Sequence, residues 1–225
     1  MNLALVPLPE VTSVDTPNGR FYSTADGLFK YPSVTTVLGR QAKDTGLQKW
    51  IDAVGVKEAE RQKNFGGRRG SQLHAWLEDY VLTGTDPIPG KFSFGPDIVR
   101  HMIFRNMRRE LDAHLTKVYG CEVGMISHIL RLGGRCDLIG QWDGEDAIID
   151  YKNSKNRKPN EDILSYFLQT TAYSLMFEEI TGIACKKIVI LIGNQNEDTA
   201  QCIVENRSKY LVPLKELLAA ERIES

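Results

Sequence analysis

Apolar and polar positions change their period several times along the chain, and each change marks an expected element. The pattern predicts a hairpin at residues 20–31, turning at Asp26-Gly27, and three short strands between 118 and 152. Turn residues between those three strands are Gly133-Gly134 and Asp143-Gly144. Helices are expected at about 46–63, 67–82, 96–117, 160–181 and 207–222, and further strands near 186–193 and 199–205.

This order of elements predicts an α/β fold with a mixed central β-sheet flanked by helices. The 225 residues are most simply one domain. Within it we expect an N-terminal hairpin and helices at about 1–117, a core at about 118–205 that holds the three strands, and a C-terminal helix at about 206–225. The N-terminal helices are expected to form a cap or arch beside the sheet.

An acidic and a basic residue end the third of these strands. Asp150 and Lys152 follow an apolar run at 147–149. Because side chains alternate between the two faces of a strand, these two are expected to share a face, while the residues between and before them point the other way. Asp137 lies on the preceding strand and Glu122 on the strand before that. Neighbouring strands would therefore bring carboxylates and an ammonium group together.

Carboxylates beside a lysine are the residue types that metal-dependent cleavage of a phosphodiester needs. Mg²⁺ and Mn²⁺ take oxygen ligands and keep positions open for water and phosphate. The ion polarises the phosphoryl oxygen and lowers the pKa of a bound water, and a nearby lysine orients or deprotonates that water or offsets charge on the phosphoryl group. Each residue alone has a simpler explanation: Asp-x-Lys at a strand end is more often a solvated ion pair, and Asp137 could equally be a turn residue.

Together with three further segments, these residues occur in the order of a known family. The chain resembles the PD-(D/E)xK nuclease superfamily, and within it the RecB-type branch that includes the mitochondrial genome maintenance exonuclease and related phage exonucleases. The further segments are residues 66–74, which end at His74; the Gln-x-x-x-Tyr of Gln169 and Tyr173; and residues 31–38, Tyr-Pro-Ser-Val-Thr-Thr-Val-Leu. The resemblance extends over roughly residues 30–210.

The resemblance implies a restriction-endonuclease-like core and a role for each residue. The implied metal ligands are His74, Asp137, Asp150 and the backbone carbonyl of Tyr151. Glu122 fills the family's first acidic position by strand order, and Lys152 would position or activate the water. Gln169 and Tyr173 would hold the DNA backbone or the nucleophile.

Two positions depart from the family pattern. Cys136 stands where the superfamily has the proline of its name, and Asn153 stands where the RecB-type branch often has threonine. The iron–sulfur-bearing members of the family are excluded, because their cluster needs closely spaced thiolates and the four cysteines of this chain are widely scattered.

Some of these positions also fit ordinary structural roles. Gln169 and Tyr173 share a helix face at i, i+4, where a packed tyrosine with a surface glutamine is the simpler assignment if the pair is taken alone. His74 lies at the edge of a helical apolar stripe, so taken alone it is a core histidine more often than a ligand. If it is a ligand, Mn²⁺ should support activity, because imidazole suits Mn²⁺ better than Mg²⁺.

Composition and charge set the expected surroundings. The chain is 42% apolar and 25% charged, as ordinary globular proteins are, and no segment approaches the apolar length of a membrane span. Four cysteines without paired spacing indicate a reducing compartment, and the first residues lack the features of a signal or transit peptide. We therefore expect a cytoplasmic protein, in a bacterium or a phage-infected cell, with no membrane partner.

The expected partner is DNA, and single-stranded DNA in particular. Because the net charge is −1, contacts to phosphates must come from local patches. The best patch is a run of four cations within seven residues, Lys152, Lys155, Arg157 and Lys158, which also fits a solvated loop. Arg68 and Arg69 lie in a glycine-rich stretch where the backbone can approach a phosphate.

The expected function is therefore a Mg²⁺- or Mn²⁺-dependent DNA exonuclease. A free DNA end would be required if the predicted helices at 46–82 arch over the sheet, so that a strand must be threaded. Two other classes of function stay open: a structure-specific endonuclease on the same fold, and a non-catalytic DNA-binding protein, which the complete set of acids and Lys152 disfavours. Alanine at Asp150 or Lys152 is expected to abolish cleavage and leave the fold intact.

Overall fold

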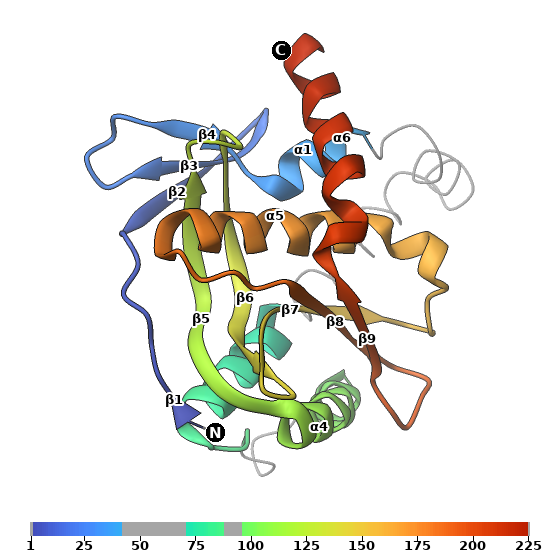
Figure 1. Cartoon of the computed structure of the whole chain (residues 1–225). Coiled ribbons are helices and arrows are strands. Elements are labelled where there is room, and N and C mark those ends of the chain that lie inside the picture. The colour runs from blue at the N-terminus through green and yellow to red at the C-terminus, as the bar shows by residue number, and fades with distance from the viewer. Residues whose placement is uncertain (1, 42–70, 88–95, 225) are drawn as a thin grey trace.

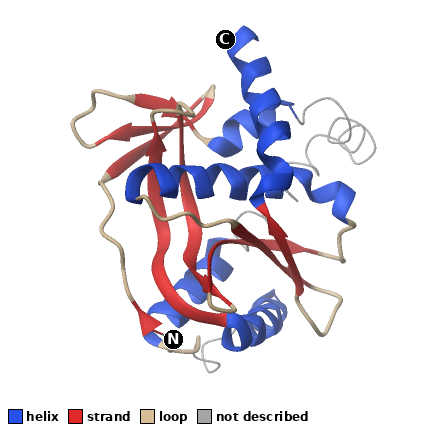
Figure 2. Cartoon of the chain, in the orientation of Figure 1, coloured by secondary structure: helices blue, strands red, loops and turns tan. Residues whose placement is uncertain are grey.

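The computed structural model describes residues 2–41, 71–87 and 96–224, which form two β-sheets and the helices packed against them (Figure 1). In chain order the elements are β1 (Asn2–Leu3), β2 (Val11–Thr16), β3 (Gly19–Thr24), β4 (Lys30–Pro32), α1 (Val34–Gln41), a helix at 71–83, α4 (Pro96–His114), β5 (Leu115–Ser127), β6 (Leu132–Trp142), β7 (Glu145–Ser154), η3 (Asn160–Ile163), α5 (Leu164–Thr181), β8 (Lys187–Asn194), β9 (Gln201–Asn206), η4 (Arg207–Tyr210) and α6 (Leu211–Glu224). Figure 2 shows how helices surround the strands.

The larger sheet has six strands in the order β1-β5-β6-β7-β8-β9. Strands β5, β6 and β7 form an antiparallel meander, β7 pairs parallel with β8, and β8 pairs antiparallel with β9. A parallel pair needs a crossover connection, which α5 provides between β7 and β8. The predicted mixed central sheet flanked by helices is therefore confirmed.

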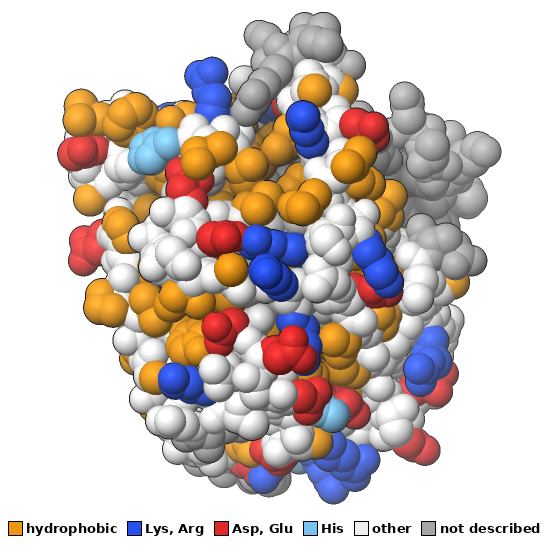
Figure 3. Space-filling model, viewed as in Figure 1, with side chains coloured by type: hydrophobic (Ala, Val, Ile, Leu, Met, Phe, Trp, Pro, Cys, Tyr) orange, Lys and Arg blue, Asp and Glu red, His pale blue; other side chains and the backbone are white. Residues whose placement is uncertain are grey.

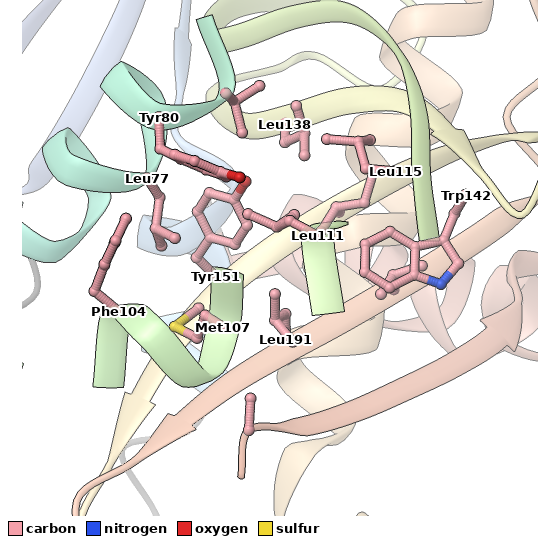
Figure 4. Close-up of a cluster of buried hydrophobic side chains, with 14 of the residues drawn as sticks. Leu77, Tyr80, Phe104, Met107, Leu111, Leu115, Leu138, Trp142, Tyr151 and Leu191 are labelled. Atoms are coloured by element: carbon pink, nitrogen blue, oxygen red, sulfur yellow. The ribbon is translucent and has the colours of Figure 1, made fainter. Parts of the chain in front are cut away.

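Helices cover the two faces of this sheet and bury an apolar cluster on each. One cluster joins the helix at 71–83 and α4 to the sheet, and in Figure 4 Tyr151 points into it beside Leu77 and Leu111. The other joins α1, α5 and α6 to the opposite face. Strand β8 is buried along nearly its whole length, as its apolar run Ile188-Val189-Ile190-Leu191-Ile192 leads one to expect for a strand covered on both faces.

One of the two predicted turns in the meander is correct and the other is wrong. Asp143-Gly144 connects β6 to β7, and both residues have positive φ (53° and 78°), as a two-residue hairpin turn of type I′ requires. Gly133-Gly134 was expected to be a turn but lies inside β6, and the turn is at residues 128–131. The two glycines are needed for packing instead: a Cβ would lie 2.3 Å from Tyr22 at the first and 2.4 Å from Tyr173 at the second.

The smaller sheet has three strands in the order β2-β3-β4. The predicted hairpin turning at Asp26-Gly27 is confirmed as β3 and β4, while β2 was not predicted. This sheet packs on the far end of the β5–β6 hairpin, where Ser33 forms a bridge with Gly133. The tip of the β5–β6 hairpin and the tip of the β3–β4 hairpin thus belong to one region of the molecule.

The remaining predicted elements agree with the structure to within a few residues. Helix α4 ends at His114 and not at 117, because β5 begins directly after it. The helix predicted at 160–181 is a 3-10 turn followed by α5, which Gly182 ends in the left-handed conformation while donating its N–H to Glu178. The predicted helix at 46–63, most of the expected N-terminal arch, and Arg68 and Arg69 lie outside the described residues.

Within residues 2–41, 71–87 and 96–224, no helix is both long and apolar enough to cross a membrane.

Candidate metal-dependent active site

Three side chains that are far apart in the sequence meet beside the sheet. His74 comes from the helix at 71–83, Glu122 from β5 and Asp137 from β6, and one donor atom of each lies within 4.8 Å of the other two. The Nδ1 atom of His74 lies 3.3 Å from Oδ1 of Asp137 and 3.5 Å from Oε1 of Glu122. An imidazole nitrogen and two carboxylates in this arrangement are suitable donors for a divalent cation.

The backbone of β5 and β6 explains how the two acids come together. The pairs Cys121–Leu138 and Val123–Cys136 place Glu122 and Asp137 opposite one another in the ladder. Glu122 has a φ of 48°, in the left-handed region that costs a non-glycine residue about 1–2 kcal/mol. Such strain persists only where surrounding contacts hold it, and it is often found at functional sites.

Asp137 is also connected to the third strand of the meander. Its Oδ2 accepts a hydrogen bond of 2.7 Å from the backbone N–H of Tyr151. The regular pairing of β6 with β7 ends at Leu138–Ile149, one position before this bond. The two strands therefore separate at the site, and the side chain of Asp137 bridges the gap while its other oxygen faces His74.

The opposite charges in this cluster stabilise each other's ionised forms. Burial alone would lower the pKa of His74, but hydrogen bonds and charge from Asp137 and Glu122 raise it to about 10. Burial alone would raise the pKa of Asp137, yet His74 and the charge of Lys152 hold it below its usual value. Without a metal, an imidazolium therefore offsets the two carboxylates. A metal ion binding here would have to displace that proton, because only neutral imidazole is a ligand.

Asp150 and Lys152 form a second pair next to the cluster. The predicted alternation holds: Ile149 and Tyr151 belong to the apolar cluster beneath α4, and Lys152 lies on the α5 side, 5.1 Å from the ring centre of Tyr166. The ammonium group of Lys152 contacts Oδ2 of Asp150, whose side chain is 1% exposed. Burial raises the pKa of Asp150 to about 6, and the charge of Lys152 limits the rise.

The buried carboxylate of Asp150 makes few polar contacts among the described residues. Apart from the ion pair with Lys152, neither of its oxygens has a hydrogen-bond partner among the described residues. Buried carboxylates normally accept several hydrogen bonds or coordinate a metal. Asp137 accepts a hydrogen bond from the backbone of Tyr151, the residue after Asp150, and the charge of Asp137 contributes to the raised pKa of Asp150. A divalent cation close to both acids would therefore fit this part of the site.

The Gln-x-x-x-Tyr pair lies on α5, on the side of the sheet where Lys152 lies. Nε2 of Gln169 donates a hydrogen bond of 3.3 Å to the hydroxyl of Tyr173. Tyr173 is 3% exposed, and the ring lies against Gly134. Gln169 is partly exposed, so it is the member of the pair that a bound strand could contact.

The cation run after β7 is mostly at the surface. Lys155 and Arg157 are exposed, and Lys158 is partly buried. The side chain of Gln201 holds the backbone of Lys158 through both its N–H and its carbonyl, at 3.0 and 2.7 Å. These two hydrogen bonds hold the backbone in place at Lys158, six positions after Lys152.

Two residues beside the site were not singled out from the sequence. Glu78 lies one helical turn after His74, and burial together with the charge of Glu122 raises its pKa. Its i, i+4 spacing from His74 was the available signal. Tyr166 lies beneath the ammonium group of Lys152, and only the crossover of α5 over the sheet brings it there.

The contact between Gly134 and Tyr173 gives a stability prediction. In Gly134→Ala the new Cβ would lie 2.4 Å from the Tyr173 ring, so the ring must move, and we expect a loss of about 1–3 kcal/mol in unfolding free energy, as for other overpacked cores. The control is Gly39→Ala in α1, where nothing lies within 4 Å and the change should be neutral or stabilising. Urea unfolding measures both. Equal midpoints for Gly134→Ala and the wild type would contradict the packing described here.

Comparison with known proteins identifies a family for the central part of the chain. The model of the PD-(D/E)XK nuclease superfamily matches residues 93–198, a range that contains Glu122, Asp137, Asp150 and Lys152. Nucleases of this superfamily use divalent metal ions. No curated protein matches the sequence.

Two solved structures illustrate how distant the relatives of known structure are. The "putative exonuclease" of Eubacterium rectale is 10% identical, with a TM-score of 0.46, over 69% of this chain and 65% of its own length. The phage-related exonuclease of Haemophilus somnus is 14% identical, with a TM-score of 0.36, over 66% of this chain and 77% of its own. This chain thus spans less than two thirds of the first of these proteins. The superfamily match covers the meander, α5 and β8, so residues 93–198 correspond to a PD-(D/E)XK nuclease superfamily domain.

Proposed function

We propose that the protein is a metal-dependent DNA exonuclease that acts at the ends of single strands. The observation that carries this proposal is the convergence of His74, Glu122 and Asp137 beside the buried Asp150–Lys152 pair. The match of residues 93–198 to a nuclease superfamily supports the reaction class. The resemblance to the mitochondrial and phage exonuclease group supports the preference for ends and for single strands.

The site residues would have two kinds of role, metal binding and positioning of the attacking water. His74, Asp137, Asp150 and the backbone carbonyl of Tyr151 would hold Mg²⁺ or Mn²⁺, with Glu122 as a further donor. When bound, the ion would polarise the phosphoryl oxygen and lower the pKa of its water. Lys152, held by Asp150 and Tyr166, would position that water and offset charge on the phosphoryl group.

The DNA strand would be held without sequence choice. Lys155, Arg157 and Lys158 lie directly after the site strand and can contact phosphates. Gln169 would contact the backbone near the cleaved bond, with Tyr173 supporting it from below. Arg68 and Arg69, which precede His74 by six and five positions in the sequence, would add two cations. The cytoplasm of a bacterium or of a phage-infected cell is the proposed location, consistent with four free cysteines.

The test is digestion of four DNA substrates with each metal. Linear single-stranded, linear double-stranded, circular single-stranded and nicked circular DNA are incubated with Mg²⁺ or Mn²⁺, and the linear forms carry a label at one end. We expect the linear single strand to be shortened from an end and circles to persist. Asp137→Asn is the control for contaminating nucleases. Cutting of circular single strands at the rate of the linear form would replace the exonuclease with an endonuclease.

A further inference from the structure

The tips of two hairpins form an aromatic surface away from the candidate active site. One tip is the β3–β4 turn and the other is the β5–β6 turn at residues 128–131. The rings of Phe29 and His128 pack edge to face with centres 4.6 Å apart, and the Tyr31 hydroxyl lies 3.2 Å from Nδ1 of His128. We call this region the hairpin-tip surface, made of Leu28, Phe29, Lys30, Tyr31, His128, Ile129 and Arg131.

Large apolar side chains are exposed on this surface. Leu28 is 76% exposed, Ile129 73% and Phe29 46%. Turns are normally built from small and polar residues, so apolar side chains at two adjoining tips need an explanation other than turn formation. Figure 3 shows hydrophobic side chains gathered at the upper left with a histidine and a cationic side chain among them. Exposed apolar groups that cluster in this way mark interaction sites.

A hollow adjoins the same surface. It has a volume of about 470 Å³, within the range of small-molecule binding pockets. Its walls include the rings of Phe21 and Tyr31 and the cations Lys30 and Arg131. Its acidic wall residue, Glu221, is paired with Arg40.

Two cations, Lys30 and Arg131, accompany one exposed acid at the tips, Asp26, whose carboxylate accepts hydrogen bonds from Thr24 and from the backbone of Leu28. Neither Lys30 nor Arg131 forms a salt bridge within the part of the chain that the structure describes. The nearby Glu179 is already occupied, since it accepts hydrogen bonds from Ser127 and from the backbone of His128. Arg131 has a φ of 59°, a conformation that glycine or asparagine would adopt at lower cost.

These features together match one class of occupant. Aromatic rings on which bases stack, beside cations that meet phosphates, are the means by which proteins bind single-stranded nucleic acid without sequence preference. An apolar partner protein would use the exposed leucine and isoleucine but would leave Lys30, whose ammonium group lies 5.2 Å from the ring centre of Phe21, and Arg131 without an anionic partner. The charge complementarity of Lys30 and Arg131 with phosphate therefore favours a nucleic-acid strand.

Strands β5 and β6, which carry Glu122 and Asp137 of the candidate active site, also lead to the hairpin-tip surface. Glu122 and Ser127 are five positions apart along β5, a distance of about 17 Å at the rise of an extended strand. At about 3.4 Å for each stacked nucleotide, this is about five nucleotides. A strand engaged at the metal site could thus reach the hairpin tips with its next few bases.

We propose that the hairpin-tip surface is a secondary binding site for single-stranded DNA, about five nucleotides from the cleaved bond. The bases stack on Phe29 and Tyr31 or enter the adjoining hollow, and Lys30 and Arg131 contact phosphates. This inference rests on the proposed function for its substrate class. The surface would add stacking and phosphate contacts to the strand that the catalytic residues do not provide.

The test uses the full chain and a variant that should fold normally. Phe29→Ala with Arg131→Gly removes one exposed ring and one cation, and glycine relieves the left-handed backbone at 131. The matched control is Val204→Ala with Lys186→Ala, an exposed apolar residue and an exposed cation at the β8–β9 side of the sheet. Binding of a fluorescent oligothymidylate of about 12 nucleotides, within the site sizes of single-strand binders, is measured by anisotropy in EDTA, where no cleavage is needed.

We expect the hairpin-tip variant to raise the Kd about 5- to 100-fold, the change expected when a base loses a stacking partner, and the control to leave it unchanged. With metal, kcat/KM should fall for long oligonucleotides and stay unchanged for those of about four nucleotides, which are too short to reach the tips. Equal Kd values for variant and wild type would overturn the proposal and leave a protein partner as the occupant. A wild type that binds DNA through these residues but never cuts it would instead contradict the proposed nuclease function.

Discussion

Replacing Asp150 with asparagine should lower the rate of DNA cleavage by about 10²- to 10⁴-fold, the range for loss of a positioned catalytic group. The same change removes the partner of Lys152, whose side chain is only 20% exposed. Breaking a buried ion pair from one side costs about 3–5 kcal/mol, and the partial exposure of Lys152 places this variant at the lower end. We therefore expect alanine variants at Asp150 and Lys152 to lose stability as well as activity.

A double variant separates the catalytic effect from the structural one. Asp150→Asn with Lys152→Met removes both charges at nearly constant volume, and such replacements are often neutral for stability. We expect its unfolding free energy to return to within about 1 kcal/mol of the wild type, while cleavage stays absent. Urea unfolding and a cleavage assay on one preparation give both values. Return of activity together with stability would show that the pair is only a structural ion pair.

Replacing His74 with glutamine should raise the Mn²⁺ concentration needed for half-maximal cleavage by at least about 10- to 100-fold, the effect seen even for residues that only support a metal ligand. The imidazole contributes a donor atom, and it also lies between two carboxylates that it holds in place. Metal titration of cleavage and the melting temperature are measured together. Without metal the melting temperature should also fall, because Glu122 and Asp137 lose their shared cation.

His114→Gln is the matched control for this prediction. His114 also contacts carboxylates, with Nδ1 2.7 Å from Asp143 and Nε2 3.8 Å from Glu110, but it lies outside the metal cluster. Its replacement should leave the Mn²⁺ requirement unchanged. If His74→Gln melts earlier than the wild type and yet needs the same Mn²⁺ concentration, His74 is a structural histidine and the metal assignment is wrong.

Local signals were enough to predict most of the fold. The meander, the crossover helix and the two last strands follow from periodicity and from turn residues such as Asp143-Gly144, because these features depend on neighbours in the sequence. The placement of Gly133-Gly134 could not be predicted in this way. Their smallness is required by Tyr22 and Tyr173, which only the folded chain brings against them.

In the candidate site, too, some features could be predicted from the sequence and others depend on the folded chain. The sequence indicated the acids and His74, and the structure brings His74, Glu122 and Asp137 together. It did not indicate that Glu122 adopts a left-handed backbone, or that Asp137 bridges to the backbone of Tyr151. Both depend on how β5, β6 and β7 diverge at one point of the sheet. Glu78 was missed because its only local signal, a spacing of four from His74, is common on any helix.

We propose that the acids beside His74 bind a divalent metal that DNA cleavage requires. The direct measurement is the rate of cleavage of an end-labelled single strand by purified wild type and by Asp137→Asn, in Mn²⁺, in Mg²⁺ and in EDTA. We expect cleavage by the wild type with metal, none in EDTA, and a loss of about 10²-fold or more in Asp137→Asn with either metal. Cleavage that persists in EDTA, or that Asp137→Asn retains at the wild-type rate, would contradict it.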